Sequence, residues 1–101
     1  MFTEKNRSML SIDPPTYRAV AASVMQAIAD KDFFNGSVEY DTDEFYSTLR
    51  MTLIVYRDRE APGCGGAIRN IVPVWWEFSL SQSGGEVDTD FSWRELREYL
   101  I

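Results

Sequence analysis

Histidine is absent from the 101-residue chain, and Cys64 is its single cysteine. Without an imidazole, a histidine cannot activate a serine or cysteine nucleophile, and histidine-ligated metal sites are excluded. One cysteine allows no intramolecular disulfide, which favours a reducing compartment. Acid–base chemistry is left to carboxylates, one thiol, and tyrosine, lysine and arginine side chains. The composition therefore favours a binding protein over an enzyme.

Long apolar runs and clusters of basic residues are also missing. No stretch approaches the ~20 apolar residues of a transmembrane helix, and residues 1–12 lack the apolar segment of a signal peptide. Ten lysines and arginines stand against sixteen acidic residues, for a net charge of −6. Nucleic acids and anionic membranes require clustered basic residues. We therefore expect a cytoplasmic protein with neither kind of partner.

The composition is otherwise that of a folded protein, with 45% hydrophobic and 26% charged residues. A chain of this length forms one domain with one modest core. Residues 1–12 are predicted to be a flexible leader, and residues 13–101 a single α+β domain.

Two helices are predicted, one near each end of that domain. Asp13 is the expected N-cap of the first, in which apolar residues recur at three- and four-residue steps from Thr16 to about Lys31. We expect Asn35-Gly36 to end it, with Phe33 and Phe34 packed beneath the exit. The last helix opens at Ser92, because Glu95 follows at the capping-box spacing.

Three strands are predicted between the helices, over residues 37–41, 45–59 and 71–82. Strands adjacent in sequence usually pair, so the α-β-β-β-α order predicts a three-stranded antiparallel sheet with two helices packed on one face. The expected core has contributions from both helices and from one face of each long strand: Tyr17, Val20, Val24, Ile28, Leu49, Met51, Leu53, Val55, Val72, Val74, Trp76, Phe78, Leu80, Trp93, Leu96 and Leu100.

Trp75 and Trp76 provide the most informative clue to function. Neighbouring residues on a strand point to opposite faces, so Trp75 is predicted to lie on the face without helices. Tyrosine, tryptophan and arginine are enriched in binding hot spots. The predicted partner-binding residues on this face are Tyr46, Arg50, Ile54, Tyr56, Trp75 and Glu77. The leading interpretation is a non-catalytic module that binds a protein partner or forms a homodimer; alternatively, the leader or a Gly-rich loop covers the face.

Two other functions are compatible with the sequence. An enzyme or small-ligand binder could use the Gly63-Cys64-Gly65-Gly66 loop and the carboxylates near residues 39–44 and 86–90. An acidic mimic of nucleic acid is a third interpretation. No catalytic, cofactor-binding or metal-binding residue is assigned.

The element order resembles that of double-stranded-RNA-binding domains. Those domains carry basic residues at the start of the last helix, where this chain has Asp90-Phe-Ser-Trp-Arg-Glu95, so the charge argues against RNA binding. The same order opens the core of many nucleases, but the Glu-x-Lys motif of their strands is missing from Trp76-Glu77-Phe78-Ser79.

Overall fold

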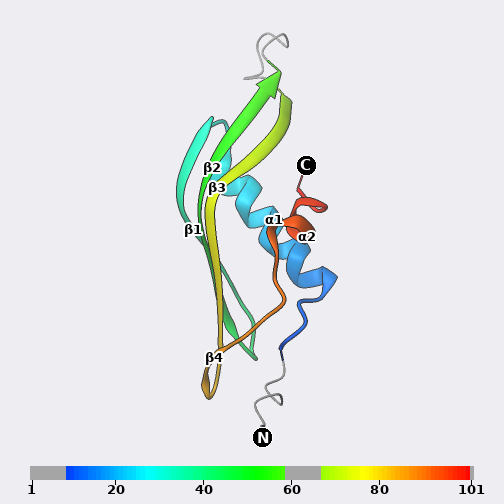
Figure 1. Ribbon diagram of the computed structural model, residues 1–101, viewed down its shortest axis with the longest axis vertical. Helices are drawn as coiled ribbons and strands as arrows, with labels where there is room; N and C mark the ends of the chain where they lie inside the picture. The colour runs from blue at the N-terminus through cyan, green and yellow to red at the C-terminus, as the bar shows by residue number, and fades with distance from the viewer. Residues whose placement is uncertain (1–8, 59–66, 101) are drawn as a thin grey trace, which may run out of the picture.

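The computed structural model describes residues 9–58 and 67–100. Its elements in chain order are α1 (Pro14–Ile28), β1 (Phe33–Asp41), β2 (Tyr46–Asp58), β3 (Ala67–Gln82), β4 (Gly85–Val87) and α2 (Trp93–Arg97). The strands form one antiparallel sheet in the order β1-β2-β3-β4. Both helices lie on the same side of this sheet (Figure 1). The predicted α+β class is confirmed, and the three-residue strand β4 is an addition that the sequence interpretation missed.

Helix α1 begins where the sequence predicted and ends earlier. The Asp13 carboxylate accepts a hydrogen bond from the Thr16 backbone N–H at 3.1 Å, and this bond lowers the pKa of Asp13. The helix stops at Ile28 because Ala29 adopts a positive φ of 50°. The prediction that Asn35-Gly36 ends the helix is wrong. These two residues lie inside β1, paired with β2.

The core lies between the helices and one face of the sheet. On β2 the buried side chains alternate strictly with more exposed ones, as the sequence predicted. Every core residue assigned to the two predicted helices is also buried, although Leu100 lies beyond the end of α2. These confirmed positions are Tyr17, Val20, Val24, Ile28, Leu49, Met51, Leu53, Val55, Trp93, Leu96 and Leu100. The sequence therefore identified most of the core on α1, β2 and the C-terminal segment.

A β-bulge in β3 overturns part of the predicted core. Thr52 pairs with Trp75 and Leu53 with Pro73, which leaves Val74 as an extra residue. The bulge reverses the alternation of the residues that precede it. Val74 is consequently exposed, and Val72 pairs with Ile54 on the face without helices. The assignment of Val72 and Val74 to the core was therefore wrong.

Phe91, which the sequence interpretation left out of the core, lies at the centre of its aromatic part. Its ring stacks on Phe78 with centroids 4.0 Å apart and on Tyr17 at 5.2 Å, and meets the edge of Trp76 at 5.7 Å. Phe91 thereby joins α1 to β3 from the segment between β4 and α2. Trp76 and Phe78 are half-buried and pack against the core, which agrees with their predicted face.

The segments at the two ends of the chain meet near Asp90. Its carboxylate accepts hydrogen bonds from the Ile12 N–H at 2.8 Å and the Ser11 hydroxyl at 3.2 Å. Two backbone hydrogen bonds tie Leu10 to residues 88 and 90. The described end of the predicted leader is thus attached to the segment that leads into α2.

Ser92 is the N-cap of helix α2, as predicted. The Ser92 hydroxyl accepts from the Glu95 N–H at 3.1 Å. The Ser92 N–H, however, donates to the Tyr17 hydroxyl at 3.1 Å, so α1 completes the cap. The first turn of α2 is thereby joined to α1.

Candidate functional site on the outer face of the sheet

The face of the sheet opposite the helices, called here the outer face, is organised in rows across three strands. Residues paired across antiparallel strands point to the same face. From the Tyr56 end of β2 downward, the rows are Phe33–Ile54–Val72, Asn35–Thr52–Trp75, Ser37–Arg50–Glu77 and Glu39–Thr48–Ser79. The face is therefore apolar and aromatic in its upper rows and polar below them.

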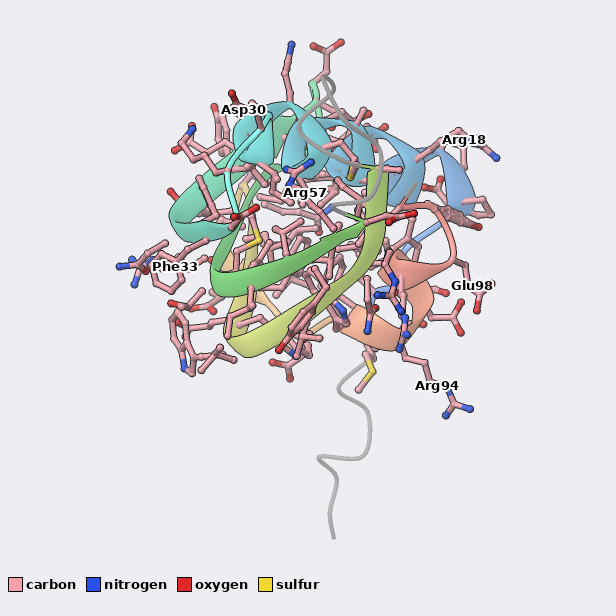
Figure 2. All side chains as sticks on the ribbon, turned by 90° about the horizontal axis from the view of Figure 1, so that it is seen from above. Arg18, Asp30, Phe33, Arg57, Arg94 and Glu98 are labelled. Carbon is pink, nitrogen blue, oxygen red and sulfur yellow. The ribbon has the colours of Figure 1, made fainter. Side chains whose placement is uncertain are left out.

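An apolar and aromatic cluster occupies this upper end. We call it the outer cluster; it comprises Phe33, Ile54, Tyr56, Val72, Val74 and Trp75. The exposed fractions are 57% for Phe33, 51% for Tyr56, 61% for Val74 and 50% for Trp75. Figure 2 shows Phe33 pointing outward at the periphery of the molecule. With roughly 200 Å² per aromatic side chain, these four residues expose on the order of 400 Å², the size at which an apolar patch on a monomer is often functional.

The structure brings together three of the six residues predicted to bind a partner. Ile54, Tyr56 and Trp75 belong to the outer cluster. Arg50 and Glu77 are exposed and lie opposite each other in the polar row beyond Trp75. Tyr46 is also exposed, but ten residues along the strand separate it from Tyr56, a distance of about 33 Å. The predicted face therefore contains an upper cluster, a charged pair and a distant tyrosine.

The sequence interpretation missed Phe33, Val72 and Val74 as members of the outer cluster. Phe33 was predicted to pack beneath the exit of the first helix, and this prediction was wrong. It stands instead at the start of β1, opposite Ile54. Val72 and Val74 were assigned to the core face because the prediction did not include the bulge. Pro73 between them was an available signal, because a proline within a strand indicates an edge or a bulge.

The described part of the leader does not run over the outer cluster. Residues 10–12 are hydrogen-bonded to the segment around Asp90. Met9 lines a hollow with Trp76, Phe78 and Phe91, which pack on the helix side of the sheet. The Gly63–Gly66 loop, with Cys64, lies outside the described residues. Among the described elements, both helices lie on the other side of the sheet (Figure 1).

The carboxylate-rich segments have structural partners in several places. Asp41 accepts a hydrogen bond from the Ser47 N–H at 3.3 Å, and Asp90 holds residues 11 and 12. Within residues 9–58 and 67–100, no three acidic or cysteine side chains are placed to hold a metal ion. No helix in the described part of the chain has the length and apolar character needed to cross a membrane.

Comparison with known proteins identifies no relative of this chain. No protein-family profile, curated protein sequence or solved structure matches this chain.

Proposed function

We propose that the protein is a small interaction module that associates through its outer cluster, with another protein or with a second copy of itself. The observation that supports this proposal is the run of exposed apolar side chains in the upper rows of the outer face. Large aromatic side chains contribute much contact area at a small loss of conformational freedom. An apolar surface of this size favours a protein contact over exposure to water.

The size of the outer cluster sets the expected strength of the association. A standard interface buries about 800 Å² on each partner, and the four most exposed members of the cluster supply on the order of half of that area. We therefore expect a transient contact, with a Kd in the micromolar range or above. The polar rows around Arg50 and Glu77 would form the rim of such an interface.

A single charge in the middle of the outer cluster tests this proposal. Ile54 lies between Phe33 and Val72 in one row, so Ile54→Lys would force an ammonium group into the contact. An unpaired charge is costly to bury. The control is Thr48→Lys, because Thr48 lies on the same strand and face but outside the cluster.

Sedimentation velocity over a wide concentration range gives the result. We expect the wild type and Thr48→Lys to self-associate with increasing concentration. Ile54→Lys should stay monomeric with an unchanged far-UV circular dichroism spectrum. A wild type that is monomeric throughout would exclude self-association. If Ile54→Lys also unfolded, the outer cluster would be covered from within, which contradicts the proposal.

A further inference from the structure

We propose that a hollow beside the upper end of β3 binds a small oxyanion, either a carboxylate or a phosphate. We call it the arginine hollow; its lining residues are Tyr56, Arg69, Asn70 and Arg97. Its volume of about 440 Å³ suits a small ligand. The proposal does not depend on the interaction of the outer cluster, with which the arginine hollow shares only Tyr56.

A second β-bulge brings Arg69 to this position. Tyr56 pairs with Asn70 and Arg57 with Ile68, so Arg69 is the extra residue on β3. Strict alternation would place Arg69 and Asn70 on opposite faces of the sheet, whereas both line the arginine hollow. Bulges often re-aim side chains in this way next to functional sites.

Arg97 reaches the arginine hollow from α2 and is oriented by Asn70. Its Nη2 atom donates to the Asn70 Oδ1 atom at 3.4 Å. The same oxygen accepts from the Ile71 N–H at 2.9 Å, which fixes the Asn70 side chain. Leu96 and Leu100 are buried on either side of Arg97 in sequence, so the segment that carries this arginine is anchored in the core.

The charge of the lining residues favours an anion. Among residues 9–58 and 67–100, no carboxylate lines the arginine hollow, although acidic residues outnumber basic ones by sixteen to ten in the chain. Neither arginine forms an ion pair with another described residue. The planar guanidinium group matches the geometry of carboxylate and phosphate oxygens, and its hydrogen bonds to them are stronger than neutral ones.

An adjoining hollow of about 130 Å³ gives the site an apolar side. Arg69, Asn70 and Arg97 line it together with Ile71 and Leu100. The three polar residues are thus shared by the two hollows, with Tyr56 lining the first and Ile71 and Leu100 lining the second. This arrangement favours an oxyanion that carries a small apolar or aromatic group.

Titration with two probes, inorganic phosphate and benzoate, tests the proposal and separates the two oxyanion sources. The assay is two-dimensional ¹H–¹⁵N NMR at constant ionic strength, with the Asn70 side-chain amide and the Arg97 Nε–H as reporters. We expect saturable shifts of both signals with at least one probe. Saturation by phosphate alone would identify a phosphate site, and saturation by benzoate alone a carboxylate site.

Matched variants show whether the arginines carry the binding. Arg69→Gln and Arg97→Gln should each weaken it by about tenfold or more, the loss expected for a charge-assisted hydrogen bond. Arg94→Gln is the control: Arg94 stands three residues from Arg97, does not line the hollow and extends away from the molecule (Figure 2). Shifts that do not saturate, or an equal loss in Arg94→Gln, would overturn the proposal. The amide spectrum of each variant reports whether it is folded.

Discussion

Replacing Phe91 should test how the two layers of the domain are joined. Phe91 is buried and contacts rings from both α1 and β3. Truncating a buried phenylalanine to alanine costs about 3–5 kcal/mol, and each aromatic pair adds ~0.5–1.5 kcal/mol beyond its buried area. We expect Phe91→Ala to cost about 4 kcal/mol. That is a large part of the ~5–15 kcal/mol that stabilises a domain of this size.

Urea denaturation followed by circular dichroism gives the measurement. Phe33→Ala is the control, because it removes the same atoms from a side chain that is 57% exposed. It should cost less than about 1 kcal/mol, as surface substitutions do. Phe91→Leu preserves most of the volume and should cost ~1–2 kcal/mol. Equal losses in Phe91→Ala and Phe33→Ala would refute the central role of Phe91.

Three further predictions concern single residues. Trp76→Ala should cost about 3 kcal/mol and Trp75→Ala less than about 1 kcal/mol, since only Trp76 packs against the core; reversed losses in urea denaturation would contradict the assignment of faces. Burial, followed by the charges of Asp90 and Glu95, raises the pKa of Tyr17. The stability that Tyr17 contributes is therefore complete below its unfolded pKa of about 10, and it is lost as the pH rises through the higher folded pKa. Tyr17→Phe should remove this loss of stability in denaturation curves at alkaline pH. An unchanged loss would exclude Tyr17 as its source. Asp90→Ala should cost about 1–2 kcal/mol and speed amide hydrogen exchange at Ile12, whereas Glu86→Ala should leave that exchange unchanged.

The faces of β2 could be predicted from sequence because nothing interrupts their alternation. Its buried and exposed residues follow a period of two from Tyr46 to Tyr56. The same reasoning failed on β3, where one extra residue reverses the pattern. A bulge forms according to how a strand pairs with its neighbour. The sequence of one strand alone therefore gives only an indirect signal of a bulge. Here that signal was Pro73, which cannot donate a ladder hydrogen bond.

The helix exit and Phe91 were missed for different reasons. Asn35-Gly36 is a typical stop signal, but pairing of β1 with β2 outweighs that local preference, and Ala29 ends the helix instead. Phe91 lies between β4 and α2, where no periodic pattern marks a side chain as buried. Long-range contacts with α1 and β3 determine its burial. The site residues on the regular strand β2 were therefore predicted from alternation. The site residues whose position depends on tertiary contacts were missed.

Deleting Val74 is the sharpest test of the bulge that shapes the outer cluster. Val74 has no partner on β2, so its removal leaves Leu53 opposite Pro73 and Thr52 opposite Trp75. We expect the deletion variant to fold with its core intact and to lose less than ~2 kcal/mol, since it removes an exposed side chain and an irregularity.

Deleting Glu77, from the regular part of the same strand, is the control. Glu77 pairs with Arg50, and its loss would shift the residues on one side of it to the wrong face of the sheet. Either Phe78 and Leu80 or Trp76 and Ile71 would leave the core, at a cost of ~1.5–3 kcal/mol for each large side chain exposed. We expect this variant to be largely unfolded by circular dichroism. If the Val74 deletion is as damaging as the Glu77 deletion, then β3 is a regular strand. Val72 and Val74 would then return to the core face, and the outer cluster would lose two of its members.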